Sequence, residues 1–418
     1  MGKVFKLIIL SILFFNNCIA QTNNPDRVNG KNIHTVQFYR NDLSPQTIIN
    51  PPVTNLNQRH RIILEFDELG DQAKYYYAKV LHCNADWSES SLSSAEFMSE
   101  YNEFLIEDYN FSFNTKVEFT HYRFVVPKVK VSGNYLLKVY QSDKPDDIII
   151  SKRFMVYESL VNIVPHFRVS ELVGKRESHQ QVGFEVYYDQ FEIVMPQKEI
   201  KATIRQNQRW DNARMELTPL YFDIGREQLD FRYFDESTNF IAWNEFRNFA
   251  FRSAQFDDIN VKELDIKNQE VLLSPLRSRA EKSYVNYLEL NGNYIIENNR
   301  GDPQLSSDYF NTHFEFFSDK KGGDFYIVGK LSNWEFMEKN KFIYNPEYKK
   351  YECNIMLKQG YYDYLVHYES NSIEEEPYIM EGSFFSTQND YEIIIYHTAI
   401  GSRFDRIVGY LFRPFFDR

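Results

Sequence analysis

This chain of 418 residues contains little glycine, little proline and few basic residues. It has 16 Gly and 14 Pro against 43% hydrophobic residues, a composition that excludes a disordered or collagen-like chain. Its 47 Lys and Arg are outnumbered by 59 Asp and Glu, which gives a formal net charge of −12. A nucleic-acid backbone or an anionic lipid surface would on average repel such a protein. We therefore expect no nucleic-acid partner.

The sequence also lacks the short motifs of common catalytic and cofactor sites. It has no glycine-rich dinucleotide or phosphate loop, no paired-histidine zinc motif, no serine nucleophile motif and no regular calcium loop. Only His82, Cys83 and Asp86 form a compact group of possible ligands, and a fourth ligand is missing. We expect instead a strand that runs into a turn with Trp87 packed beneath it. No cofactor and no enzymatic activity are expected.

No hydrophobic run is long enough to span a membrane. The N-terminus carries two lysines and then a mostly apolar stretch at 7–15, whereas a spanning helix needs about 20 residues. This pattern predicts a secretory signal peptide over residues 1–20, with cleavage between Ala20 and Gln21. Cleavage would remove two lysines and no acid, so the mature charge would be 45 − 59 = −14. We expect a mature protein outside the cytoplasm with no direct membrane span.

Aromatic residues are abundant and indicate strands. Phe, Tyr and Trp make up 17% of the chain, and these residues favour half-buried strand surfaces. Apolar and polar residues alternate with a period of two in many segments, while a helical period is scarce. The sequence therefore predicts an all-β fold of tandem immunoglobulin-like β-sandwich domains. Three groups of strands predict domains at 21–158, 159–280 and 281–418 after the signal peptide.

A short pattern recurs in the first and third groups of strands. Both contain Gly-x-Tyr-x-apolar-x-Val, once from Gly133 with Tyr135 and once from Gly360 with Tyr362. In immunoglobulin-like sandwiches, a Tyr that enters a late strand after a tight turn donates a hydrogen bond back to the loop backbone. The repeat therefore supports an immunoglobulin-like fold for the first and third domains.

The two cysteines of the mature chain, Cys83 and Cys353, lie in different predicted domains. A disulfide between them would have to cross a domain boundary. Free cysteine ordinarily behaves as a small buried hydrophobe. We therefore predict two buried thiols that are not bridged to each other.

One segment of the third domain allows a different function. A strand ending in Val328-Gly329 leads to Asn333-Trp334, and this resembles the opening of the glycogen-binding, early-set immunoglobulin-like modules. An exposed Trp334 would let a sugar ring stack on its indole. A secreted carbohydrate-binding protein is therefore the alternative function, and burial of Trp334 in the sandwich core is the structural alternative.

Several segments together resemble one protein family. The most specific is His-Cys-Asn-Ala-Asp-Trp at 82–87, and it is joined by Thr-His-Tyr-Arg at 120–123 and Ser-Gly-Asn-Tyr at 132–135. These segments resemble the first domain of the type IX secretion system plug proteins of Bacteroidota. The segments at 360–364 and 401–405 resemble the C-terminal region of the same family.

This resemblance implies a non-enzymatic protein of the periplasm. It implies that the chain binds the outer-membrane β-barrel translocon of the type IX protein secretion system and seals it when no cargo passes. The expected location is the periplasmic face of the outer membrane, where the acidic mature chain would favour a basic rim on the barrel. The partner-interface candidates are residues of two signature segments: Asn84, Asp86, Trp87, Thr120, His121, Tyr122 and Arg123.

Overall fold

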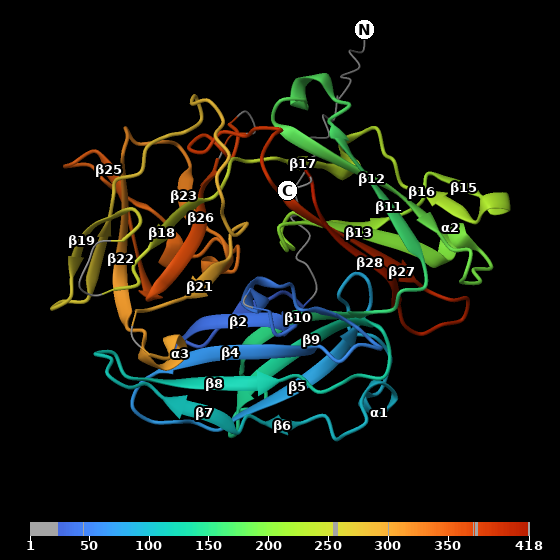
Figure 1. Ribbon diagram of the computed structural model, residues 1–418, viewed down its shortest axis with the longest axis horizontal. Coiled ribbons are helices and arrows are strands. Elements are labelled where there is room, and N and C mark those ends of the chain that lie inside the picture. Colours follow the sequence, from blue (N-terminus) through green and yellow to red (C-terminus); the bar gives the residue numbers. More distant parts are fainter. Residues whose placement is uncertain are drawn as a thin grey trace, which may run out of the picture.

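A computed structural model describes the chain at residues 24–44, 46–253, 258–299, 301–370, 372 and 375–416. The predicted cleavage site at Ala20 and Gln21 lies outside these residues. The described part is nearly all β, which confirms the predicted fold class. Its strands form six sheets, which are arranged in three units that meet around a common centre (Figure 1). No helix in the described ranges has the length and apolar character needed to cross a membrane.

The first unit is a two-sheet sandwich. One sheet has the order β1-β10-β9-β5-β6 with β3 beside β10, and the other has the order β2-β4-β8-β7. The elements are β1 (Arg27–Val28), β2 (Ile33–Asn41), η1 (Thr47–Ile49), β3 (Val53–Asn55), β4 (Arg61–Leu69), β5 (Tyr76–Cys83), α1 (Ser94–Phe97), β6 (Phe104–Leu105), β7 (Asp108–Phe111), β8 (Phe119–Val125), β9 (Gly133–Gln141) and β10 (Ile148–Tyr157).

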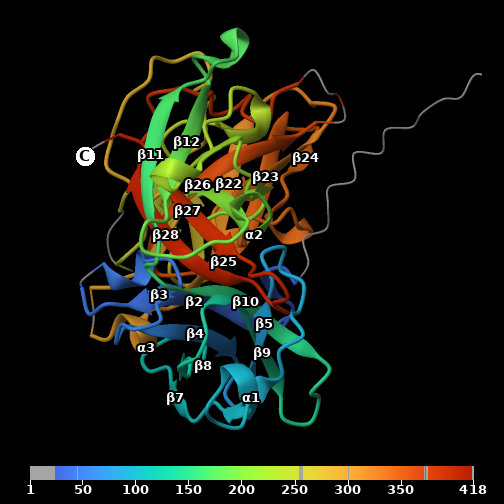
Figure 2. The ribbon, with the colours of Figure 1, turned by 90° about the vertical axis from the view of Figure 1, so that its right-hand side faces the viewer.

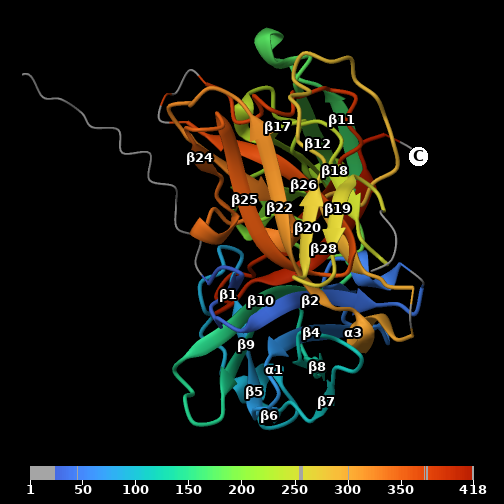
Figure 3. The same ribbon diagram turned by 90° about the vertical axis from the view of Figure 1, so that its left-hand side faces the viewer.

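Strand β4 shows how the sequence positions this sandwich. Its apolar residues Leu64 and Phe66 enter the core between the two sheets, and the alternating Glu65 and Asp67 point to the other face. Those two acidic side chains are also buried. The outer face of β4 is therefore covered by another part of the chain, and this part is the third unit (Figures 1 and 3).

The middle unit also has two sheets. Their orders are β11-β12-β16-β15 with β17 beside β12, and β14-β13-β27-β28. The elements are β11 (Asn162–Val169), η2 (Val173–Lys175), β12 (His179–Tyr187), α2 (Pro196–Glu199), β13 (Ile200–Gln206), β14 (Arg214–Leu217), β15 (Tyr221–Asp223), η3 (Ile224–Arg226), β16 (Gln228–Asp230), η4 (Glu236–Thr238), β17 (Asn239–Ile241), β27 (Asp390–His397) and β28 (Arg406–Pro414).

The third unit has the sheet orders β18-β26-β21 with β23 beside β26, and β19-β20-β22-β25-β24. Its elements are β18 (Arg247–Ala250), β19 (Val261–Asp265), β20 (Glu270–Leu273), β21 (Tyr294–Ile296), α3 (Pro303–Ser306), β22 (Tyr309–Phe317), β23 (Asp324–Val328), η5 (Lys330–Ser332), η6 (Glu338–Asn340), β24 (Ile343–Asn345), β25 (Lys350–Lys358) and β26 (Gly360–Glu369).

The sheets do not follow the contiguous boundaries expected at 159–280 and 281–418. Strand β18 pairs with β26, so the third unit begins before residue 280. The last two strands leave the third unit, because β27 pairs with β13 and β28 pairs with β27. The apolar face of β13 needs a matching partner, and the isoleucines of β27 supply it in the core of the middle unit. The middle unit is therefore built from two distant parts of the chain.

Both predicted tyrosine corners are confirmed. The Tyr135 hydroxyl donates to the Val131 carbonyl at 2.7 Å, and the Tyr362 hydroxyl donates to the Lys358 carbonyl at 2.6 Å. Each tyrosine therefore bonds to the residue four positions earlier and fixes the turn that leads into its strand. Gly133 has a φ of 151°, and a Cβ there would lie 2.3 Å from Nε2 of His82, so the first corner requires glycine.

Each unit contacts the other two (Figures 1 and 2). An apolar cluster that includes Trp87, Leu136 and Ile394 joins the first unit to the middle unit. A second cluster with Trp243 and Leu365 lies where the chain passes from the middle unit to the third. The contact between the first and third units is charged and is described below. Because the contacts close a ring of three units, each unit is held from two sides.

Candidate functional site

The predicted signature segment at 84–87 forms the turn after β5. Trp87 is fully buried, and its ring meets the ring of Trp210 edge-on at a centroid distance of 4.8 Å. The amide of Ala85 donates to Oδ2 of Asp405 at 2.8 Å. Both contacts cross from the first unit to the middle unit. The prediction of a strand that runs into a turn with Trp87 packed beneath it is confirmed, and the turn lies at a joint between units.

The second signature segment, at 120–123, lies within strand β8. Tyr122 is buried in the core of the first unit and stacks on Phe66 at 4.9 Å. Thr120 and His121 are buried as well, and His121 points to the opposite face of the sheet, toward the third unit. Only Arg123 is partly exposed, and its Nε lies 3.4 Å from Oε1 of Glu65.

A buried charged network joins the first and third units at this face. Oδ1 of Asp67 lies 2.7 Å from Nδ1 of His121. Oδ2 of Asp67 accepts hydrogen bonds from Nζ of Lys358 and from the Tyr309 hydroxyl, both at 2.6 Å. Burial alone would raise the pKa of Asp67, but the Lys358 ammonium and the His121 ring outweigh it and lower the pKa. The carboxylate is therefore ionised and ties two strands of the first unit to two strands of the third.

These positions correct part of the predicted partner interface. Buried side chains cannot touch a partner, and this removes Trp87, Thr120, His121 and Tyr122 from the candidates for direct contact. Asn84, Asp86 and Arg123 keep partly accessible side chains. The signature segments thus act mainly inside the molecule, where they join one unit to another.

Sequence reasoning missed Asp67, Tyr309 and Lys358. The sequence held no signal for Asp67, because Glu65 and Asp67 alternate with Leu64 and Phe66, a pattern typical of a strand whose polar face meets solvent. The partner Lys358 lies almost 300 positions later, and nothing in the sequence pairs the two. Such a long-range pair becomes visible only in the fold.

The group of His82, Cys83 and Asp86 is explained by packing in the fold. Burial lowers the pKa of His82 to about 4 and raises the pKa of the Cys83 thiol to about 12. A thiol in this state is a poor nucleophile at neutral pH. Cys83 and Cys353 are both buried and free, which confirms the prediction that they are not bridged. In the described ranges of the chain, no group of three or more His, Cys, Asp or Glu is arranged to hold a metal ion.

Trp334 lies between the middle and third units and is half-buried. The guanidinium of Arg209 lies 4.3 Å from its ring centroid, and the ring of Phe246 meets it edge-on at 5.9 Å. A sugar could stack on the indole face that the Arg209 guanidinium covers only by displacing that guanidinium. This geometry gives no support to the alternative of carbohydrate binding through Trp334.

The free end of the first unit carries exposed aromatic side chains. Strand β7 forms the edge of its sheet, at the bottom of Figure 1, and the loop after it reaches the third unit, where the amide of Phe113 donates to the Leu305 carbonyl at 3.1 Å. All four of its residues are exposed. We call this surface the β7 edge and define it by Tyr101, Leu105, Tyr109 and Phe111, which are exposed, together with the exposed acids Glu100, Glu103, Glu107 and Asp108. Exposed apolar patches and unpaired strand edges commonly mark interaction sites.

Comparison with known proteins identifies the first unit. The family description "Type 9 secretion system plug protein 1st domain" matches residues 33–158. This chain belongs to the type IX secretion system plug protein family. A crystal structure of a hypothetical protein from Parabacteroides merdae ATCC 43184 is 32% identical to it, with a TM-score of 0.87. The similarity covers 94% of this chain and 100% of that one. No curated protein matches.

The plug family match coincides with one structural unit. Residues 33–158 run from the start of β2 to just beyond the end of β10. They include the buried Asp67 and the whole β7 edge. Within the described residues, this first domain therefore uses one face to hold the rest of the chain, while strand β7 lies at a sheet edge with exposed side chains.

Proposed function

We propose that this protein is a periplasmic plug that binds and seals the outer-membrane β-barrel translocon of the type IX secretion system when no cargo is passing. The observation that carries the proposal is the plug-domain match over residues 33–158. The protein acts at the periplasmic face of the outer membrane and without catalysis. Its effect comes from occupying the pore.

The arrangement of the three units supports this role. A stopper must keep its shape when it is pressed against a pore, and loosely linked domains would move independently. Here apolar clusters and a buried ion pair join the units. The middle unit also contains strands that come before and after the third unit in the sequence. Each of the three described units is therefore held by the other two, as a stopper requires.

The β7 edge is the surface that we assign to the translocon. It combines aromatic side chains with four exposed acids, and aromatic residues commonly carry most of the energy of an interface. A basic, partly apolar rim on the barrel would complement it in charge. A reversible plug needs an interface of roughly 800 Å² per partner with a polar rim, and it does not need a permanent hydrophobic seal.

Deletion of the gene tests the sealing function. Large antibiotics that the outer membrane normally excludes should enter the deletion strain, and the complemented strain should exclude them again. Affinity purification of the tagged protein should recover the barrel, and idle barrels should be enriched over cargo-loaded ones, because a plug and an outgoing substrate exclude each other. Failure to copurify with the barrel, together with Trp334-dependent retention on a polysaccharide column, would favour the carbohydrate-binding alternative.

A surface variant tests the assigned contact. Phe111 on β7 is 54% exposed, and Phe317 at the end of β22 in the third unit is 63% exposed. Phe111→Asp should weaken copurification of the barrel at least tenfold, which corresponds to about 1.4 kcal/mol. Phe317→Asp is the matched control and should leave copurification unchanged. If both variants recover the barrel equally, the contact does not lie at the β7 edge. The deletion strain tests the sealing function separately, so that proposal would stand.

A further inference from the structure

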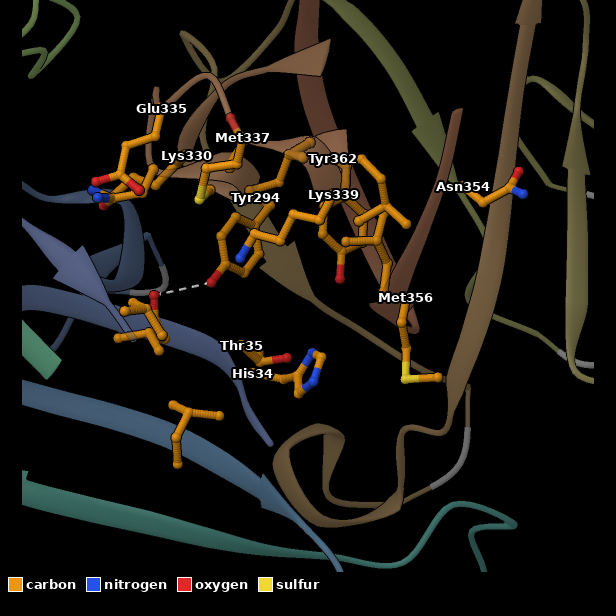
Figure 4. Close-up of a pocket in the computed structure, with 18 of the residues that line it drawn as sticks. His34, Thr35, Tyr294, Lys330, Glu335, Met337, Lys339, Asn354, Met356 and Tyr362 are labelled. Atoms are coloured by element: carbon orange, nitrogen blue, oxygen red, sulfur yellow. Dashed lines mark hydrogen bonds between the residues drawn. The ribbon is translucent and has the colours of Figure 1, made fainter. Parts of the chain in front are cut away.

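A cavity lies where the first and third units meet, close to the middle unit. It has a volume of about 240 Å³ and is lined by residues of β2, β10, β21, β25 and the segment 330–339. A second cavity of about 200 Å³ reaches the middle unit at Arg205 and Trp210. The two cavities share four polar residues, which are Lys152, Lys330, Asn333 and Glu335. Figure 4 shows the first cavity, with Lys330 and Glu335 at one side and Asn354 and Met356 at the other.

Two lysines of the cavity are tied to neutral partners across unit boundaries. Lys152 of the first unit is 7% exposed, and its Nζ donates to Oδ1 of Asn333 at 2.5 Å. Nζ of Lys330 donates to Oε1 of Gln208 in the middle unit at 3.2 Å. Within the described ranges, no carboxylate forms an ion pair with either lysine. An ammonium carries three N–H donors, so each lysine keeps donors for another partner.

The charge of the cavity is opposite to that of the protein. The chain carries a formal net charge of −12, yet three cations line the first cavity: Lys152, Lys330 and Lys339. Among the described lining residues, Glu335 is the one acid of the first cavity, and Asp26, which lines the second, attracts both Lys152 and Lys330. Burial lowers the pKa of Lys330 to about 8, and repulsion from Lys152 adds to this effect. An anion placed between the lysines would relieve this unfavourable state.

Apolar side chains form much of the remaining cavity wall, together with the polar residues His34, Thr35 and Ser332. Ile33, Tyr294, Leu357 and Tyr362 are buried side chains that line it. The Tyr294 hydroxyl donates to the Val36 carbonyl at 3.1 Å, so its polar atom is already satisfied. Exposed side chains, among them Lys339, Asn354 and Met356, line the cavity where it opens to solvent. A ligand that enters there can contact the apolar side chains as well as Lys152 and Lys330.

We propose that this junction is a binding site for an aliphatic carboxylate of medium length. Its carboxylate accepts hydrogen bonds from Lys152 and Lys330, and its alkyl chain lies against Ile33, Tyr294 and Leu357. A volume of 240 Å³ holds about eight water-sized groups at roughly 30 Å³ each, which suits a chain of about eight carbons. Because the lysines belong to different units, the ligand joins the first unit to the third.

Isothermal titration calorimetry of the full mature chain tests this site with three probes. Octanoate carries both the charge and the alkyl chain, 1-octanol carries the alkyl chain alone, and acetate carries the charge alone. Octanoate should bind, and 1-octanol and acetate should each bind at least tenfold more weakly. No measurable octanoate binding to the wild-type chain, or equal affinity for octanoate and either of the other probes, would overturn the assignment.

Variants locate the binding. Lys152→Met and Lys330→Met keep an unbranched apolar stem and remove the charge, and each should weaken octanoate binding at least tenfold while circular dichroism shows the native fold. Met337→Trp fills the apolar part and should also weaken octanoate binding. Lys144→Met, in the exposed loop after β9, is the matched control and should leave octanoate affinity unchanged. Unchanged affinity in both cavity lysine variants, or an equal loss in the control, would refute the site.

Discussion

Substitution of Lys358 should reveal how much its buried ion pair with Asp67 stabilises the contact between the first and third units. Its side chain is 0% exposed, that of Asp67 is 1% exposed, and Nζ lies 2.6 Å from Oδ2. Lys358→Met fills the space with a neutral side chain and leaves Asp67 with His121 and the Tyr309 hydroxyl as partners. Breaking a buried ion pair in this way costs about 3–5 kcal/mol. We expect the free energy of unfolding to fall by about that amount.

A double-mutant cycle isolates the pair. Asp67→Asn with Lys358→Met leaves neither charge unpaired, so the double variant should lose at least about 2 kcal/mol less than the sum of the single variants. Guanidinium unfolding followed by tryptophan fluorescence and circular dichroism measures these differences, with equal denaturant slopes as the condition for comparing midpoints. Lys349→Met is the control, since Lys349 and Asp319 form an ion pair whose side chains are 74% and 89% exposed. It should change stability by less than about 0.5 kcal/mol.

The pH dependence has a defined sign. The pKa of Asp67 is lowered in the folded chain from an ordinary value of 3.8. Its stabilising contribution is therefore complete above the unfolded pKa and is lost as the pH falls through the lower folded pKa. The penalty of Lys358→Met should be largest near neutral pH and shrink as the pH falls, because without the lysine burial raises the pKa of Asp67 in the variant, and protonation then removes the unpaired charge. Additive single variants, or a penalty no larger than that of Lys349→Met, would refute the reasoning.

Three further predictions concern buried thiols, tyrosine corners and processing. Burial raises the pKa of the thiols of Cys83 and Cys353 to about 12, so iodoacetamide should label neither in the native chain and both after denaturation without reduction. Tyr135→Phe and Tyr362→Phe each remove a corner hydrogen bond and should each lower the free energy of unfolding by about 1–3 kcal/mol in guanidinium titrations. Mass spectrometry of the periplasmic protein should find Gln21 at its N-terminus, and a lipid-modified N-terminal cysteine would contradict the cleavage.

Local features of this fold could be predicted from sequence because their causes are local. The alternation of apolar and polar residues predicts the strands, since the side chains of a strand point to opposite faces in turn. The Gly-x-Tyr pattern predicts both tyrosine corners, because the bond from Tyr135 or Tyr362 spans only four residues. The turn that buries Trp87 could be predicted because a strand ends there at the polar residues Asn84 and Asp86.

The joints between units could not be predicted in the same way. The sequence pattern of β27 is that of any buried strand, and it does not reveal that β13 is its partner. The third unit therefore begins before the predicted boundary at residue 280, and the last two strands after that boundary belong to the middle unit. The partners of Asp67 and the lysines of the cavity come from different units, and their positions depend on how three folded sheets pack. Sequence patterns of short period carry no information on that packing.

The segments that carry the family resemblance have a structural use that differs from the expected one. The segments 82–87 and 401–405 are far apart in the chain, yet the amide of Ala85 donates to Asp405 at 2.8 Å. Next to this contact, Arg406 forms an ion pair with Glu158 at 2.7 Å. The signature segments therefore mark the contact between the first unit and the two C-terminal strands, which belong to the middle unit. A surface that meets the translocon needs no such internal contacts, which is why we place it at the exposed β7 edge and not at the signature residues.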